Sequence, residues 1–246
     1  ENSVVISQFT LKEVIRQTIF SIADNENNKL MTGELFEIEN NNMKVVSLDG
    51  HRISLRNIEL KDNYDHIKVV VPGKTLNEIS KILTGEADKD VVIYFTDKHI
   101  LFEFDETTVL SRLIEGEYFR IEQMLSTDYE TKMSINKREF LNCIDRATLL
   151  VKEGEKKPII INVTDEDMEL KINSTIGSMN ENIDIVKEGK DIMIGFNPKF
   201  LIDSLKVIDD EEINIYMVNP KAPCIIRDDH NTYLYLILPV NFTVSN

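Results

Sequence analysis

The densest group of reactive side chains in the sequence is Asp49-Gly50-His51-Arg52, which places a carboxylate, an imidazole and a guanidinium within four consecutive residues. Groups of these types provide acid–base chemistry in enzymes and hydrogen bonds in binding sites. A hydrolase that uses His51 and Asp49 is therefore one interpretation. The other is a hairpin turn between two apolar segments, with His51 and Arg52 directed into solvent.

The other candidate sites each lack a feature that their chemistry requires. Gly73-Lys74-Thr75 resembles the end of a phosphate-binding loop, but Lys68 stands where that loop needs a glycine. The histidines have no metal-ligand spacing. The acidic runs Asp165–Asp167 and Asp209–Glu212 lack the alternating ligands and central glycine of a calcium loop. The sequence predicts no catalytic residue, no metal site and no cofactor.

An internal repeat decides the domain organisation. Phe9–Ile15 resembles Ile135–Leu141, 126 positions further on, and Val71–Leu76 resembles Phe196–Leu201, 125 positions further on. Two separate segments with nearly the same offset indicate a duplicated domain. A protein built from copies of one module more often forms a symmetric surface or ring than a catalytic cleft.

The repeat predicts an α+β fold in which each half contains a helix, a hairpin, a strand, a second helix and a three-stranded meander, with both helices on one face of antiparallel sheets. We expect a first domain over residues 1–115, a packed connector over 116–129 and a second domain over 130–246. The polar run Asn40–Asn42 predicts a turn between two strands. The predicted helices are Thr10–Ala23, Gly73–Leu83, Ile135–Lys152 and Asn197–Val207; the predicted strands are Leu30–Glu39, Met43–Leu48, Ile53–Leu55, Ile67–Val71, Val91–Phe95, His99–Phe104, Thr107–Leu113, Ile159–Val163, Met168–Ser174, Asp191–Phe196, Glu212–Val218, Ala222–Arg227 and Thr232–Leu238.

Charge is distributed unevenly between these elements. The net charge is −15, yet the four predicted helices together carry +5, which leaves −20 for the remainder. Basic helices on an acidic protein indicate a polarised surface, although helices also tolerate Lys and Arg well for other reasons. The two cysteines, one in each half, favour reduced structural thiols in a cytoplasmic protein. Because the chain begins at Glu1 without an initiator Met or signal pattern, we expect it to be cut from a longer one.

The C-terminal end is unusually apolar. Tyr233–Val240 is continuously apolar and is interrupted only by Pro239. Since a proline cannot continue a strand ladder easily, the last apolar side chains are expected to lie exposed.

Four motifs together resemble one family. Asp49–Arg52, Leu113–Phe119, Gly195–Asn197 and Leu238–Val240 occur in this order in the bacterial β sliding clamps, the processivity subunits of DNA polymerase III. The resemblance runs from about residue 4 to residue 242. It is to the second and third of the family's three domains.

The resemblance implies a mechanical and non-enzymatic role in DNA replication. Two protomers of the family form a ring around duplex DNA, with helices lining the hole. A chain without the first domain should be monomeric, and the alternative is a complete two-domain clamp that forms a trimer. The residues that the resemblance and the helix positions place toward DNA are Lys12, Arg16, Lys74, Lys81, Arg138, Lys199 and Lys206.

The resemblance also implies a peptide-binding groove between the two domains. Short linear motifs of the polymerase III α subunit, the clamp loader and repair polymerases dock there in the family. Two residues depart from the family pattern: Leu48 replaces a usual Thr, and Asn241 replaces a common basic residue. The residues implied for the groove are Met31, Leu48, Gly50, His51, Arg52, Ile53, Phe119, Gln123, Met124, Asn197, Phe200, Lys221, Pro223, Leu236, Ile237, Leu238, Pro239, Val240 and Asn241.

Overall fold

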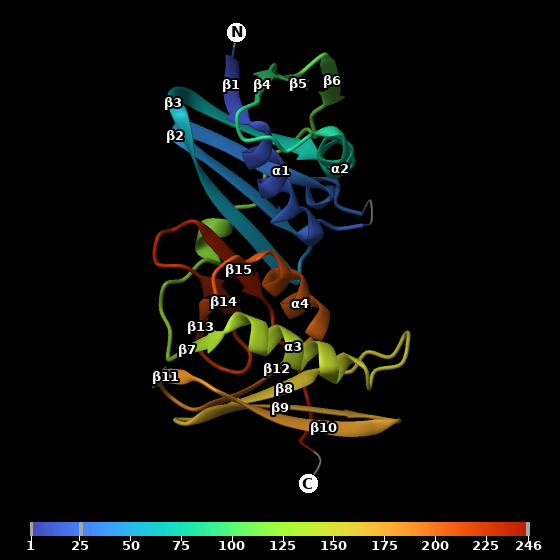
Figure 1. Ribbon diagram of the computed structural model, residues 1–246, viewed down its shortest axis with the longest axis vertical. Helices are drawn as coiled ribbons and strands as arrows, with labels where there is room; N and C mark the ends of the chain where they lie inside the picture. Colours follow the sequence, from blue (N-terminus) through green and yellow to red (C-terminus); the bar gives the residue numbers. More distant parts are fainter. Residues whose placement is uncertain (1, 25–26, 245–246) are drawn as a thin grey trace. The chain divides into compact units, whose positions relative to one another are not determined.

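The computed structural model describes residues 2–24 and 27–244, which fold into two compact units (Figure 1). Unit 1 comprises Glu1–Ile121 and Asn231–Tyr233, and unit 2 comprises Glu122–His230 and Leu234–Asn246. The strand pairings described within each unit are antiparallel. No helix in the described part of the chain is long and apolar enough to span a membrane. The predicted α+β class is confirmed.

Unit 1 combines a four-stranded sheet in the order β1-β4-β5-β6 with a long hairpin, β2–β3. Helices α1 and α2 pack side by side (Figure 1). Their buried side chains, including Leu11 and Leu76, join the same apolar core as Phe36 and Phe102. In chain order the elements are β1 (Asn2–Ser7), α1 (Gln8–Arg16), the 3-10 turns Ile19–Ser21 and Lys29–Thr32, β2 (Gly33–Leu48), β3 (Arg52–Pro72), α2 (Gly73–Ile82), β4 (Asp90–Phe95), β5 (His99–Phe104) and β6 (Thr107–Arg112).

Unit 2 repeats this plan. One sheet has the order β10-β9-β8-β12, while β11, β7, β13, β14 and β15 lie side by side in that order. Helices α3 and α4 pack together, with Phe140 and Leu201 buried. The elements are β7 (Thr131–Asn136), α3 (Lys137–Thr148), β8 (Ile159–Val163), β9 (Asp167–Ser174), β10 (Gly177–Asp184), β11 (Val186–Gly189), β12 (Ile192–Phe196), α4 (Pro198–Val207), β13 (Glu212–Met217), β14 (Cys224–Arg227) and β15 (Tyr233–Ile237).

Equivalent strands of the two units pair in the same register. All six residues of β1 pair with β4, and all six residues of β7 pair with β13. The buried apolar side chains fall at the same two places, Val4 and Ile6 in β1 and Met133 and Ile135 in β7. The duplication expected from the sequence is therefore present in the strand pairing itself.

The predicted alignment of the first helices was wrong by three residues. Helix α1 is capped by Ser7, whose hydroxyl accepts from the N–H of Thr10, and α3 is capped by Asn136. These caps are 129 positions apart, whereas the sequence comparison gave 126. Short polar caps carry little sequence similarity, since Ser and Asn perform the same role.

Both first helices are shorter than predicted. The predicted helix to Ala23 ends at Arg16, because Thr18 turns its hydroxyl back to the carbonyl of Val14 and the following chain forms a 3-10 turn. The predicted helix from Ile135 to Lys152 spans only Lys137–Thr148, because the residues before Asn136 belong to β7.

The turn predicted at Asn40–Asn42 is also wrong. Strand β2 continues through it, with a register shift against β3 and φ of 53° at Asn40. Asn tolerates this left-handed conformation, so the three residues form a bulge and not a hairpin. The reversal occurs instead between Leu48 and Arg52.

Four strands, β1, β7, β10 and β11, were missed. β10 buries only Ile183 and alternates polar residues on both faces, so it carries no apolar periodicity. In the predicted connector over residues 116–129, Tyr118 and Ile121 are buried and most of the other residues are exposed.

Candidate functional site

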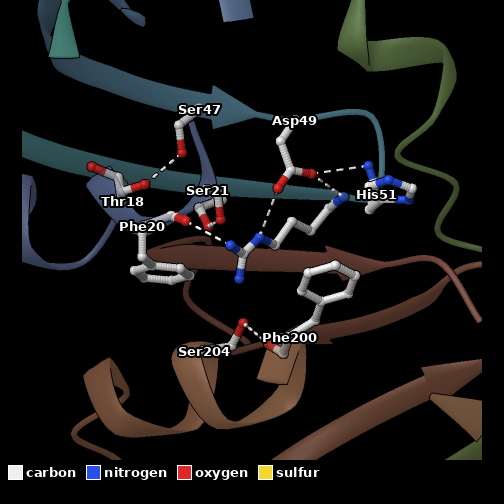
Figure 2. Close-up of polar contacts among 10 residues, drawn as sticks. Thr18, Phe20, Ser21, Ser47, Asp49, His51, Phe200 and Ser204 are labelled. Atoms are coloured by element: carbon white, nitrogen blue, oxygen red, sulfur yellow. Dashed lines mark hydrogen bonds and ion pairs between the residues drawn. The ribbon is translucent and has the colours of Figure 1, made fainter. Parts of the chain in front are cut away.

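Asp49 and Arg52 hold the β2–β3 turn in place (Figure 2). One carboxylate oxygen of Asp49 accepts hydrogen bonds from the backbone N–H groups of His51, at 2.9 Å, and Arg52, at 3.2 Å. The other oxygen accepts from Nε of Arg52 at 3.1 Å. Gly50 has φ of 88°, a left-handed conformation that glycine adopts without strain. The turn is therefore fixed by its own side chains.

A second set of contacts ties the turn to the segment that follows α1. Arg52 is only 7% exposed, and its Nη2 donates to the carbonyl of Phe20 at 2.7 Å. Its guanidinium carbon lies 5.6 Å from the centroid of the Phe20 ring. On the neighbouring strand, the Ser47 hydroxyl donates to the carbonyl of Thr18 (Figure 2). Both strands of the hairpin thus anchor the same short segment.

These contacts favour a rigid surface turn over an acid–base pair. The Asp49 carboxylate already accepts three hydrogen bonds from the turn, so it acts as a structural group. His51 is exposed at the tip. Within residues 2–24 and 27–244, no group of three or more His, Cys, Asp or Glu side chains is placed to hold a metal ion.

The C-terminal tail leaves β15 and lies against β12. Leu238 is 36% exposed, and the N–H of Val240 donates to the carbonyl of Gly195 at 2.9 Å. A Cβ atom on Gly195 would lie 2.7 Å from Cδ1 of Phe242 and 3.0 Å from the carbonyl oxygen of Val240. Only glycine leaves room for this approach. The predicted sites did not include Phe242, although Gly195 was part of a recognised motif.

The residues implied for the peptide groove differ in exposure. Within unit 1, Leu48 and Ile53 are cross-strand partners in β2 and β3. Within unit 2, Asn197, Val240 and Asn241 line one cavity. The buried members are Leu48, Arg52, Ile53, Leu236 and Ile237; the half-buried members are Met31, Phe119, Asn197, Phe200, Pro223, Pro239 and Val240; the exposed members are Gly50, His51, Gln123, Met124, Lys221, Leu238 and Asn241.

The seven predicted DNA-facing residues all lie on helices: Lys12 and Arg16 on α1, Lys74 and Lys81 on α2, Arg138 on α3, Lys199 and Lys206 on α4. Lys12 donates to the carbonyl of Leu83 at 3.1 Å, and Arg16 and Lys81 each pair with a glutamate at 2.8 Å. The side chains of the other four are exposed and have no hydrogen bond or ion pair with another described residue. With the observed bounds each helix carries +1, so the helices total +4 and the remainder −19.

Glu34 is an electrostatic anomaly in unit 1. It lies on β2, is fully buried, and neither carboxylate oxygen has a hydrogen-bond partner among the described residues. Burial raises the pKa of Glu34 from its ordinary 4.5 to about 8, and the Thr18 side chain opposes this only in part. The Thr18 hydroxyl is already donated to the carbonyl of Val14, at 2.6 Å. Glu34 is therefore held mostly protonated at neutral pH.

Two models of one protein family match consecutive parts of the chain. The central domain of the DNA polymerase III beta subunit matches residues 5–119, and its C-terminal domain matches residues 122–241. The chain belongs to the DNA polymerase III β subunit family. The resemblance seen in the sequence, to the second and third domains of that family, is thereby confirmed.

Curated members of the family are similar over nearly the whole chain. The beta sliding clamp of Staphylococcus aureus strain N315 is 34% identical over 245 residues, and that of Staphylococcus epidermidis strain ATCC 12228 is 32% identical over 243 residues. Each alignment covers 98% of this chain and 64% of the relative. The chain thus spans somewhat less than two thirds of the length of these relatives.

Solved structures of the family share the fold. A putative DNA polymerase III beta subunit from Eubacterium rectale is 75% identical with a TM-score of 0.97, covering 98% of this chain and 66% of that one. The DNA polymerase sliding clamp of Bacillus subtilis is 33% identical with a TM-score of 0.95, covering 99% of this chain and 65% of that one. The two units are therefore β subunit domains, as the resemblance implied.

Proposed function

We propose that this chain is the part of a sliding clamp that carries its central and C-terminal domains, and that it tethers the replicative polymerase to duplex DNA without catalysing a reaction. The observation that carries the proposal is the consecutive match to these two domains, on a chain whose two units repeat one strand register. The structural use of Asp49 in the turn supports a non-catalytic role over the hydrolase interpretation.

In this role, the helices would contact DNA through its phosphates. Each of the four helices carries +1 on a chain with a net charge of −15, so the helical surfaces attract phosphates more than the rest of the chain does. Contacts of this kind carry no sequence information and permit sliding. Lys74 and Arg138 would contribute most, because no other described residue engages their side chains. Lys199 and Lys206 have no such partner either, but they also line a cavity of unit 2.

Short peptide motifs of the polymerase, the clamp loader and repair polymerases would dock in a groove formed by the β2–β3 turn and the C-terminal tail. The rigid turn presenting His51 and the partly exposed Leu238 support this role. Burying one or two Leu or Phe anchors contributes about 1.5–3 kcal/mol each. Ordering the peptide offsets part of this, so we expect affinities on the order of micromolar, which suits exchange between partners.

The working assembly would be a homodimeric ring in the bacterial cytoplasm, closed by contacts between the family's first and third domains. Unit 2 offers a surface for such a contact. In the described chain β10 pairs on one side only, with β9, and Leu149 is 78% exposed. By itself the chain is expected to be monomeric.

Peptide binding tests the proposal directly. Fluorescence anisotropy with a labelled peptide ending in Leu-Phe should give micromolar affinity for the intact chain. A chain truncated after Leu238 should bind much more weakly, while truncation after Thr243 is the matched control. Equal binding by the intact and Leu238-truncated chains would remove the tail from the site.

Light scattering after size exclusion tests the assembly. A mass of one chain supports the proposal. A mass of three chains would instead favour a complete two-domain clamp that forms a trimeric ring.

A further inference from the structure

Unit 2 contains a cavity of about 690 Å³ between the end of α3, the loop that follows it, and α4. We refer to it as the basic cavity. Four lysines line it, two from the loop (Lys156 and Lys157) and two from α4 (Lys199 and Lys206). Its volume is in the range of pockets that hold small ligands or short peptide segments.

The charge of the basic cavity is opposite to that of the chain. Its lining carries four lysines against Glu155 and Asp203, a net charge of +2, whereas the whole chain carries −15. Among the described residues no ion pair or hydrogen bond engages the ammonium groups of Lys156, Lys199 and Lys206. Lys157 has one distant acidic neighbour, Glu155, at 3.7 Å. These cations are available to a ligand.

The basic cavity is continuous with the residues implied for peptide docking. Asn197, Val240 and Asn241 belong to the implied peptide groove and also line the cavity. The resemblance to the family implies a basic residue at the position of Asn241. Lys157 and Lys199 line the same cavity as Asn241, so they supply positive charge close to the position where this chain lacks it.

The apolar part of the lining favours a peptide over a nucleic acid backbone. Val151, Pro158 and Ile202 contribute apolar surface to the same cavity. Phosphates of duplex DNA are contacted by protruding side chains and gain nothing from an apolar hollow. A peptide segment with carboxylate side chains uses both kinds of lining.

We propose that the basic cavity binds the acidic flank of a docking peptide and selects partners whose motif carries Asp or Glu beside its apolar anchors. This inference rests on the proposed peptide-docking function. It adds a charge preference that comes from loop and α4 lysines of unit 2.

The test compares four labelled peptides in fluorescence anisotropy at about 50 mM salt, where exposed charges are weakly screened. Each peptide carries a Leu-Phe anchor. Two have the acidic flank Asp-Glu-Asp, one before and one after the anchor, and the other two have the neutral flank Asn-Gln-Asn at the same places. With the flank at one of these two places, we expect the acidic peptide to bind about fivefold more tightly than the neutral one, as two partly exposed ion pairs would give.

The variant K156Q/K199Q should lose this preference and keep its affinity for the neutral peptide. The matched control is K171Q/K190Q, which changes the net charge equally but removes lysines paired with Glu169 and Glu130, at 3.0 and 2.7 Å, outside the basic cavity. The control should keep the preference, and both variants should retain the thermal unfolding temperature of the parent chain.

Each contrary outcome has a separate meaning. Equal binding of acidic and neutral peptides, or a preference that survives K156Q/K199Q, would overturn the inference and leave the docking function intact. Displacement of the acidic flank by duplex DNA would assign the cavity to phosphates instead. Failure of all four peptides to bind would overturn the docking function itself.

Discussion

The buried Glu34 side chain makes the stability of unit 1 depend on pH in an unusual direction. Burial raises its pKa from 4.5 to about 8, so between these values the folded chain keeps a proton that the unfolded chain releases. The free energy of unfolding therefore falls as pH rises through this window, by ~1.4 kcal/mol for each pH unit. Below pH 4.5 both states are protonated and the effect is absent, and above pH 8 it reaches its full size.

Substitution of Glu34 by Gln removes the ionisable group and nearly preserves its shape. The stability of Glu34→Gln relative to the parent chain should then increase by about 3 kcal/mol between pH 5 and pH 8. The change with pH is the informative quantity, because any constant cost of burying an amide without partners cancels between the two pH values.

Urea unfolding followed by circular dichroism at several pH values measures this difference; the chain has no tryptophan, so fluorescence would depend on tyrosines alone. Glu39→Gln is the matched control, because Glu39 lies on the same strand and is exposed. If the stability difference between Glu34→Gln and the parent did not change between pH 5 and pH 8, Glu34 would have to be solvated or paired, contrary to the structure.

Two further substitutions test the turn and the tail. Asp49→Ala removes three hydrogen bonds and leaves the guanidinium of Arg52 buried without its carboxylate, so we expect the free energy of unfolding of unit 1 in urea to fall by about 2–4 kcal/mol. His51→Ala should change it by no more than about 0.5 kcal/mol. Similar stabilities for the two variants would contradict the structural role of Asp49. Gly195→Ala places a methyl group 2.7 Å from the Phe242 ring, so we expect a stability loss of about 1–3 kcal/mol and faster cleavage of the tail in limited proteolysis. The added change Phe242→Ala should restore part of the lost stability. An unchanged cleavage rate would mean that the tail does not lie on β12.

Sequence reasoning succeeded where apolar periodicity was strong. The strands His99–Phe104 and Ile159–Val163 have the predicted bounds, and α2 and α4 agree within one residue at each end. In these elements the buried side chains recur at the spacing of the element itself, so the pattern alone is sufficient.

Long-range contacts explain the failures. Nothing near Arg16 in the sequence shows that Ser47 and Arg52 will bind the carbonyls of Thr18 and Phe20, yet these bonds stabilise the chain after α1 in a non-helical path. Asn40 is a residue type that is typical of turns. Because β3 pairs with β2 on both sides of it, the chain forms a bulge there instead of a turn.

In the candidate sites, too, residue types could be recognised from the sequence, but long-range contacts could not. The turn at Asp49–Arg52 was identified from its residue types, but its side-chain bonds were not predicted. Lys156 and Lys157 were not among the predicted site residues, because only the structure shows the cavity that they share with α4. A lysine in a polar loop carries no signal in the sequence that separates it from an ordinary surface charge.

Hydrogen–deuterium exchange with and without a saturating Leu-Phe peptide tests the central claim most directly. If one groove is formed by the β2–β3 turn and the C-terminal tail, the peptide should slow exchange both near His51 and between Leu236 and Asn241, with no change in β10. Protection of only one of these two segments, or of neither, would contradict the account.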